Sequence, residues 1–353
     1  MVKLVHEWSA ATDKSTLNNY VRIINLDFSK AFDLIDHNIL LDKLVHFGVP
    51  DVLISWIADF LYNRRQRVKI GDFFSEWLPI TAGVPQGTKL GPILFLCMIN
   101  SFHTSIQHCK YIDDTSLYGI SSNPTDSIFQ EAVDQASQWA SDHNMRLNPV
   151  KTTDTIIDFR KHPRFFPTVI IDDQPIAISD CFHLLGVTFS NRLQWDLHVD
   201  SITCKANSRL FFLKQLKRGG GQRHDLLTFF KSVIRPILEY SCPAWHPLLT
   251  EQQHQTLENI QKRACRIICP FTPYDEVLST LMLDSFRERR NRSSLEFFRN
   301  MENPVHSLHS LLPPRHTRVR TTRASYKYVR IFCKTDRYKN CLVNWSIDRI
   351  YYV

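Results

Sequence analysis

The chain has 353 residues, of which 43% are hydrophobic and 22% are charged, and its formal net charge at pH 7 is +8. This composition excludes a disordered or collagen-like chain, and the length allows two or three subdomains with buried cores. The positive charge favours a polyanionic partner such as nucleic acid.

The nine cysteines are scattered, without a CxxC pair or the spacing of a zinc site, so we expect free thiols in a reducing compartment. No apolar run approaches membrane-spanning length, and the first residues lack the apolar core of a signal peptide. We therefore expect an intracellular protein of the nucleus or cytoplasm, neither secreted nor bound to a membrane.

The first third of the chain alternates strand and helix patterns. The run "VRIINL" predicts a strand over 21–26 that ends on Asp27. After it, the apolar spacing and turn residues predict helices over 37–49 and 51–65, a hairpin over 66–80 with its turn at Gly71–Asp72, and a buried helix over 93–99.

The rest of the chain changes from mixed to helical character. A helix is predicted over 124–143, capped by Ser122 or Asn123, with Pro124 in its first turn. Further strands are predicted over 155–159, 168–171 and 183–189, followed by helices over 202–216, 223–241 and 250–268. Beyond about residue 285 the sequence becomes arginine-rich and loses its periodicity. We therefore expect an α/β core, a helical region and a basic tail.

Two pairs of adjacent aspartates follow predicted strands, Asp113–Asp114 in "KYIDDTSLYG" and Asp172–Asp173 in "TVIIDDQPIAI". Adjacent carboxylates repel each other, so a solvated turn is the simplest explanation for either pair. A site for two divalent cations is the alternative, because the cations offset the repulsion. Asp27, at the end of another strand, could complete such a site. Local context does not distinguish the two pairs.

Two motifs precede the first pair, "NLDFSKAFDLIDH" (25–37) and "GVPQGTKLGPILF" (83–95), and a third motif, "YIDD" (111–114), contains it. Together they resemble the reverse transcriptases of non-LTR (LINE-type) retrotransposons. The resemblance implies that Asp27, Asp113 and Asp114 are catalytic and bind two Mg²⁺ ions, with Mn²⁺ as a substitute. The second aspartate pair falls on no motif of the family, which favours a turn there.

The same resemblance implies a nucleotide site. Phe32 would lie under the sugar and exclude a 2′-hydroxyl, and Pro85, Gln86 and Gly87 would approach the incoming nucleotide and the template base. Glycine at position 87 permits the close approach of backbone to ligand.

Two downstream segments extend the resemblance to about residue 270. The motif "LNPVKT" (147–152) implies that Lys151 lies near the triphosphate with a catalytic role. The segment "HLLGVTFSNRLQW" (183–195) resembles the strand hairpin that grips the primer end, which implies that role for Leu185 and Gly186.

The implied fold is an α+β palm of the right-hand polymerase type, followed by a mostly helical thumb. The expected boundaries are a palm with partial fingers over 1–195, thumb and connection over 196–285, and a basic, poorly defined tail over 286–353. Family members have longer fingers and commonly a nuclease domain upstream, so we expect a chain truncated at its N-terminus. The implied partners are an RNA template, a DNA primer and deoxynucleoside triphosphates. The alternative is a non-catalytic, nucleic-acid-binding remnant.

Overall fold

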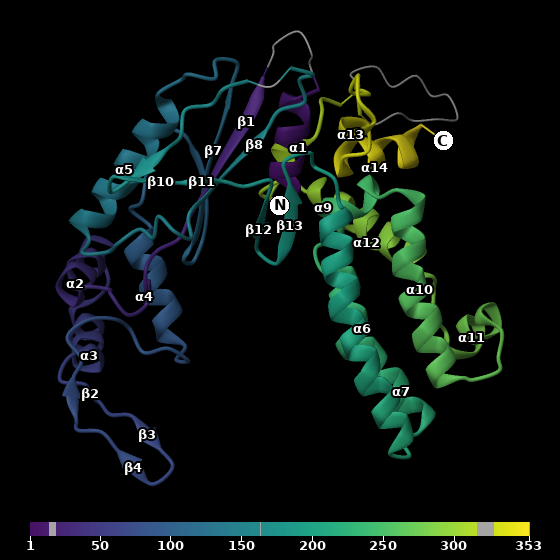
Figure 1. The fold of residues 1–353 in the computed structure, drawn as a ribbon, viewed down its shortest axis with the longest axis horizontal. Helices are drawn as coiled ribbons and strands as arrows, with labels where there is room; N and C mark the ends of the chain where they lie inside the picture. Colours follow the sequence, from purple (N-terminus) through teal and green to yellow (C-terminus); the bar gives the residue numbers. More distant parts are fainter. Residues whose placement is uncertain (14–18, 163, 316–327, 353) are drawn as a thin grey trace. The chain divides into compact units, whose positions relative to one another are not determined.

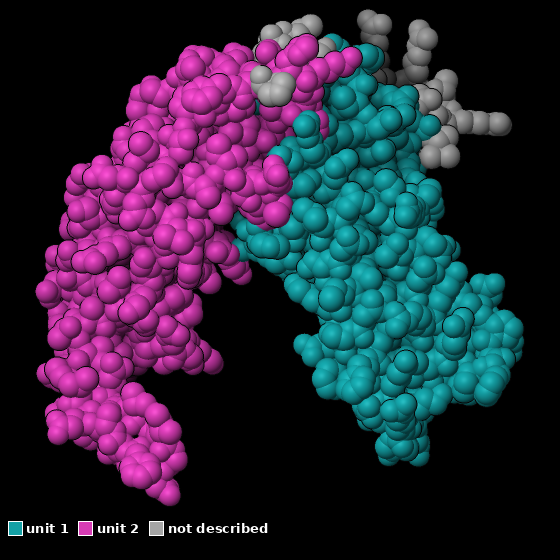
Figure 2. Space-filling model, viewed as in Figure 1, with its two compact units in different colours: residues 1–20, 183–353 teal, residues 21–182 magenta. Residues whose placement is uncertain are grey.

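The computed structural model describes all residues except 14–18, 163, 316–327 and 353. The chain forms two compact units, which Figure 2 shows in different colours. Unit 1 consists of Met1–Tyr20 together with His183–Val353, and unit 2 consists of Val21–Phe182. The domain boundaries expected after residues 195 and 285 stay predictions.

A five-stranded sheet forms the centre of unit 2 (Figure 1). Its strands lie in the order β11 (Ala177–Ile178), β8 (Thr153–Ile157), β1 (Tyr20–Leu26), β7 (Asp114–Ser121) and β6 (Gln107–Tyr111). The β1–β8 and β6–β7 pairs are antiparallel, and β11 runs parallel to β8. β1 is the middle strand, and all its residues except Asn25 are buried. The apolar run predicted for this strand favours such burial.

Helix α5 (Ile128–Asp142) packs its apolar face into unit 2, and its buried residues recur at helical spacing: Phe129, Ala132, Val133, Ala136, Trp139 and Ala140. The predicted helix is confirmed, but its predicted start is wrong. Asn123 Oδ1 accepts hydrogen bonds from the backbone nitrogen and hydroxyl of Thr125, at 3.2 and 3.0 Å. This local turn competes with helix formation, so the helix begins at Ile128.

A buried ion pair joins two strands of the sheet. Arg22 on β1 donates from Nη2 to Oδ2 of Asp154 on β8 at 2.6 Å and from Nε to Oδ1 at 3.1 Å. The two side chains are only 2% and 0% exposed. The same Nη2 donates to the carbonyl of Pro167 at 2.6 Å, and the guanidinium lies over the ring of Phe129. These contacts compensate the charge of Arg22 inside the unit.

Between β1 and β6 the chain forms three helices and a long hairpin that extends beyond α3 in Figure 1. These elements are α2 (His37–His46), α3 (Asp51–Leu61), β2 (Arg65–Gln66), β3 (Lys69–Ile70), β4 (Phe73–Phe74), β5 (Leu78–Pro79) and α4 (Leu90–Ile99). Ile70 pairs with Phe73, which confirms the predicted turn at Gly71–Asp72. Helix α4 is only half buried, because Ile93 and Leu96 are exposed.

Unit 1 is mostly helical. The β12–β13 hairpin (Cys181–Leu184 and Val187–Ser190) begins in the last two residues of unit 2 and continues in unit 1. The helices of unit 1 are α1 (Val2–Ala11), α6 (Asp196–Arg218), α7 (Arg223–Phe229), η1 (Phe230–Ile234), α8 (Arg235–Glu239), α9 (Cys242–Trp245), η2 (His246–Leu248), α10 (Glu251–Ile268), α11 (Tyr274–Leu281), α12 (Phe286–Met301), η3 (His309–Leu311), α13 (Asp336–Lys339) and α14 (Leu342–Tyr351). The helix predicted over 223–241 is therefore present as α7, a π-helical turn and α8. Pro236 lacks an N–H group, which accounts for the irregular turn before it.

Helix α10 begins as its sequence predicts. The Thr250 hydroxyl accepts from the backbone nitrogen of Gln253 at 3.3 Å, and the Gln253 side chain accepts from the backbone nitrogen of Thr250 at 2.9 Å. This reciprocal cap satisfies backbone donors at the helix start. α10 packs along α6, which Figure 1 shows as the longest helix of the unit.

The arginine-rich region contains regular structure. Helix α12 buries residues that include Phe286, Arg290 and Phe298. The Asp13 carboxylate, after α1, accepts from the backbone nitrogens of Lys334 and Thr335 at 2.9 and 2.8 Å and joins the two ends of the chain. Residues 316–327 of the basic tail expected over 286–353 lie outside the described residues. Among the helices that the structure describes, none combines the length and apolar character that a membrane span requires.

Candidate active site

Asp27 follows directly after β1 and is held by its backbone. Its nitrogen donates to Thr152 Oγ1 at 3.3 Å, and its carbonyl accepts from the backbone nitrogen of Asn148 at 2.7 Å. These bonds tie the strand end to the segment 148–152. The Asp27 side chain is 40% exposed, so its carboxylate remains open to solvent and ligands.

Asp113 and Asp114 lie where β6 turns into β7. Tyr111 pairs with Asp114, which leaves Ile112 and Asp113 as the turn, and Ile112 has a φ of +57°. Asp114 is the first residue of β7 and is followed by buried Thr115. Both aspartates are exposed. The residues before the pair are open to solvent as well, because Tyr111 is 58% exposed.

The ends of β1 and β7 meet in the sheet. Ser116 Oγ donates to Asn25 Oδ1 at 2.7 Å. Because side chains alternate along a strand, Asp27 and Asp114 project to the face on which Asn25 and Ser116 meet. Partial burial raises the pKa of Asp114, and the negative charges of Asp113 and Asp27 raise it further. The three carboxylates thus act on one another electrostatically.

Lys151 is the cation at this cluster. Its Nζ lies 4.0 Å from Oδ2 of Asp27, and its side chain is 70% exposed. The Lys151 backbone nitrogen donates to Asn148 Oδ1 at 3.3 Å, which shapes the loop that carries it. The lysine therefore stands at the open side of the site, where it can reach an anionic ligand.

A divalent cation fits the chemistry of these donors, because carboxylate oxygens are its preferred ligands and the raised pKa of Asp114 reflects repulsion that a cation would relieve. The three carboxylates are not arranged as a metal site in the structure. Among the residues that the structure describes, no group of three or more His, Cys, Asp or Glu is arranged to hold a metal ion. Metal binding therefore requires these side chains to rotate toward one another.

The motif after β1 and the motif before α4 pack against each other. The Phe32 ring stacks on Phe95 with centroids 4.7 Å apart, and the backbone nitrogen of Val84 donates to the Phe32 carbonyl at 2.9 Å. Gln86 Nε2 donates to Asp33 Oδ1 at 3.1 Å. Phe32 and Gln86 are thus neighbours on a shared framework, as a common nucleotide site requires.

Gly83 makes this packing possible. A Cβ atom there would lie 2.6 Å from the Asp33 carbonyl oxygen, and its φ is +82°. The Gly83 carbonyl accepts from Arg64 Nη2 at 2.6 Å and contacts His37 Nε2 at 2.8 Å. The sequence interpretation missed these two supports because nothing local distinguishes them from ordinary surface residues.

The remaining residues of this motif form the turn into α4. Pro85 is half-buried, and its carbonyl accepts from the Thr88 hydroxyl at 2.9 Å. Gly87 is exposed and has a φ of +78°, a conformation that favours glycine. In the first motif, Asp36 accepts from the backbone nitrogens of Asn38 and Ile39 and so caps the start of α2.

Leu185 and Gly186 belong to unit 1, where they form the two-residue turn between β12 and β13. Both have positive φ, +48° and +78°, as the tight hairpin turn requires. The predicted hairpin is confirmed, and its role at a primer end stays a prediction.

Comparison with known proteins identifies the family. Residues 3–189 match the reverse transcriptase (RNA-dependent DNA polymerase) family. Over 86% of its length the chain is 25% identical to a probable RNA-directed DNA polymerase from transposon X-element of Drosophila melanogaster. It is 27% identical, over 61% of its length, to the RNA-directed DNA polymerase from mobile element jockey of the same species. The chain spans only 35% and 25% of these two relatives.

A weaker likeness exists to solved structures. The match to the structure of apo telomerase from Candida Tropicalis covers 84% of this chain and 47% of the telomerase chain, with 14% sequence identity and a TM-score of 0.44. The matched family spans more than half of the sequence and includes Asp27, both residues of the Asp113–Asp114 pair and the glutamine motif. The chain therefore belongs to the reverse transcriptase family, as its motifs predict.

Proposed function

We propose that this chain carries the active site of an RNA-directed DNA polymerase that extends a DNA primer along an RNA template. The observation that supports this most is the meeting of β1 and β7 in the sheet, where Ser116 donates to Asn25 and the strand ends carry Asp27 and Asp114. Partial burial raises the pKa of Asp114, and the charges of Asp113 and Asp27 add to this shift. In a member of this family, such a concentration of carboxylates is suited to two Mg²⁺ ions, or Mn²⁺ in their place. Because its substrates would be nucleic acids, the protein would act in the nucleus or the cytoplasm.

In this proposal the sheet of unit 2 is the palm, and the helices α6 to α11 of unit 1 form the thumb and connection expected over 196–285. Asp27, Asp113 and Asp114 rotate to bind the metal ions. When bound, the ions lower the pKa of the primer 3′-hydroxyl and stabilise the departing pyrophosphate. Lys151 binds the triphosphate, because its ammonium group is exposed beside Asp27.

The surrounding residues position the nucleotide. Phe32 is held by its stack on Phe95 and lies under the deoxyribose, where it excludes a 2′-hydroxyl. Gln86, fixed by Asp33, and the backbone of Pro85 and Gly87 approach the nucleotide and the template base. The exposed turn at 185–186 holds the primer end.

A non-catalytic role in nucleic-acid binding is the second candidate. It is favoured by the absence, among the described residues, of a ready-made group of three metal ligands. In that case the net charge of +8 would still attract phosphates, and affinity would fall steeply with salt as counterions are released.

Primer extension on an RNA template separates these candidates. The chain should be assayed alone and in a chimaera in which it replaces the matching segment of the X-element relative. We expect Mg²⁺-dependent incorporation in the chimaera and a loss of about 10³-fold in its Asp113→Asn variant, because a metal ligand is removed. Equal incorporation by the Asp113→Asn chimaera would refute the catalytic assignment. RNA binding that persists without any incorporation would favour the second candidate.

A further inference from the structure

A polar pocket of about 310 Å³ lies within unit 1, among η2, α10, α12 and the last two helices. Its wall includes two histidines, an aromatic ring and two basic side chains: His246, His254, Trp345, Lys339 and Arg349. This volume is at the lower end of small-ligand sites, about the size that one nucleotide occupies.

Ion pairs leave the wall of the pocket with uncompensated positive charge. Both carboxylates of the wall are paired with arginines. Glu251 accepts two hydrogen bonds from Arg287 at 2.6 and 2.7 Å, and Asp348 lies 2.9 Å from Arg330. In the described part of the chain, neither Lys339 nor Arg349 has a salt bridge to an acidic group.

Arg349 is held in place by an aromatic ring. Its guanidinium lies over Trp345, 4.7 Å from the centre of the ring. Such a stack fixes a planar group with donors directed outward, the arrangement that suits bidentate contact with phosphate. The indole itself is only 8% exposed, so its role in the pocket is to hold the guanidinium in place.

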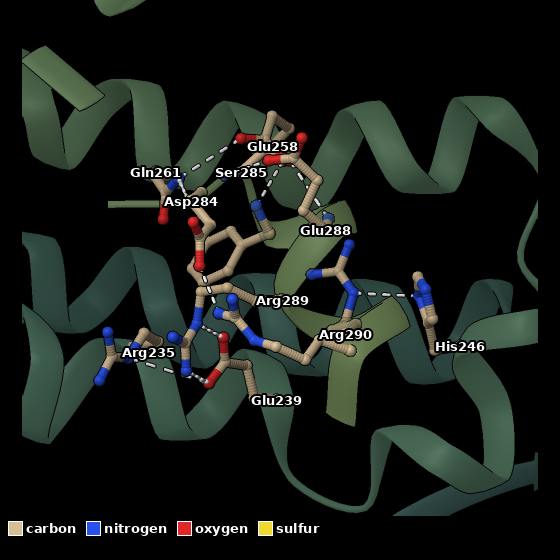
Figure 3. Close-up of polar contacts among 12 residues, drawn as sticks. Arg235, Glu239, His246, Glu258, Gln261, Asp284, Ser285, Glu288, Arg289 and Arg290 are labelled. Carbon is tan, nitrogen blue, oxygen red and sulfur yellow. Dashed lines mark hydrogen bonds and ion pairs between the residues drawn. The ribbon is translucent and has the colours of Figure 1, made fainter. Parts of the chain in front are cut away.

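A buried arginine adds to the positive field behind this wall. Arg290 is fully buried, and its Nε donates to Nδ1 of His246 at 3.1 Å (Figure 3). Its Nη1 and Nη2 have no hydrogen-bond partner among the described residues. Figure 3 also shows that Glu239, the nearby carboxylate, is taken by Arg235 and Arg289. An unpaired buried guanidinium favours an anion nearby.

The two histidines are neutral donors or acceptors in this environment. Because His246 Nδ1 accepts from Arg290, its proton lies on Nε2, which donates to Asn291 Oδ1 at 2.9 Å. Burial and the charge of Arg290 lower the pKa of His246 to about 2 and that of His254 to about 4. His254 Nδ1 is buried without a hydrogen-bond partner among the described residues.

We propose that this pocket binds a phosphate group, either of a free nucleotide or of a nucleic-acid strand. Lys339 and Arg349 contact the phosphate oxygens, and the attached sugar and base extend toward the mouth of the pocket. Nothing in this site depends on the carboxylates of unit 2, so it stands apart from the polymerase proposal.

Calorimetric titration in EDTA tests the proposal with three probes: inorganic phosphate, adenosine monophosphate and a short single-stranded RNA. We expect all three probes to bind through their phosphate group, because Lys339 and Arg349 contact that group. Lys339→Ala and Arg349→Ala should each weaken nucleotide binding about tenfold. Arg299→Ala provides the matched control, because this exposed arginine lies on α12 in its last turn, away from the pocket.

The three probes also distinguish the source of the phosphate. Loss of RNA affinity in the pocket variants indicates a strand-binding site, and loss of nucleotide affinity alone indicates a nucleotide site. Unchanged affinity for all three probes in both variants, with unchanged thermal unfolding, would overturn the proposal. The Asp113→Asn chain should bind as the unaltered chain does, so failure of polymerisation leaves this test intact.

Discussion

Two pairs of adjacent aspartates lie on hairpins of the same unit, and they differ by one residue of register. At the second pair, Ile171 pairs with Gln174, so Asp172 and Asp173 are the whole turn, with φ values of +49° and +61°. At the first pair, Tyr111 pairs with Asp114, so the turn consists of Ile112 and Asp113. Asp114 therefore belongs to a strand.

This difference in register determines in which direction the aspartate side chains of each pair point. A residue inside a strand has its side-chain direction fixed by the pleat, and Asp114 consequently shares a face with Asp27. Both residues of the second pair are exposed turn residues, as predicted, on the short strands β9 (Ile170–Ile171) and β10 (Gln174–Pro175). Similar sequence contexts thus give one ligand-like pair and one solvated turn.

A third aspartate, Asp154, differs from both pairs, and its substitution should have the largest effect on stability. Asp154 is buried on β8 and compensated by Arg22, whereas the carboxylates near Asp27 are exposed. Asp154→Asn should lower the free energy of unfolding by about 3–5 kcal/mol, because it leaves a buried guanidinium without its counter-charge. Denaturant unfolding measures this loss. A double Arg22→Met, Asp154→Leu variant should regain most of it. A loss no larger in Asp154→Asn than at an exposed site would show that the pair is not buried.

Metal affinity provides the direct contrast between the two pairs. Asp113→Asn should weaken Mn²⁺ binding by about 10–100-fold, because one carboxylate of the cluster is lost. Asp173→Asn is the matched variant and should leave the affinity unchanged. Electron paramagnetic resonance of free Mn²⁺ measures both. Equal affinities in the two variants would remove the distinction that the register makes.

Much of this contrast could be predicted from the sequence, and the failures have physical causes. The resemblance carried by the motifs implied that Asp27 and the first pair belong to one metal site. That assignment stays a prediction, and the structure shows β1 and β7 as neighbouring strands. The start of α5 was missed because Asn123 forms its own local turn. Helix α12 was missed because Arg290 and Ser294 occupy its buried face, which hides the apolar period. Side-chain placement at the metal site depends on rotamers, which no spacing encodes.

A smaller effect concerns stability and pH. Asp114 has a raised pKa in the fold, so its ionised form is destabilising relative to the unfolded chain. This contribution is absent at low pH and develops as pH rises from about 3.9, the ordinary aspartate value, through the raised value. At neutral pH without divalent cations, Asp114→Asn should therefore increase the free energy of unfolding by up to about 1 kcal/mol. Thermal unfolding at pH 3 and pH 7 tests this, since the gain should vanish at pH 3.

Divalent cations should reverse that last difference. Mn²⁺ stabilises whichever chain binds it in the folded state, so it should raise the unfolding temperature of the unaltered chain more than that of Asp114→Asn. A gain of equal size at both pH values, unaffected by Mn²⁺, would show that repulsion among the carboxylates is not its cause.

The smallest effect is expected at Asp172. Asn tolerates the left-handed conformation as well as Asp does, so Asp172→Asn keeps the turn at its φ of +49°. The free energy of unfolding should change by less than about 0.5 kcal/mol, as at an ordinary surface site. Primer extension by the chimaera and Mn²⁺ affinity should equal those of the unaltered chain. Asp172→Val is the informative companion, because a β-branched residue disfavours positive φ and should lower stability without lowering metal affinity. If Asp172→Asn instead weakened Mn²⁺ binding as strongly as Asp113→Asn, the proposal that the one-residue register shift restricts metal binding to the first pair would be refuted.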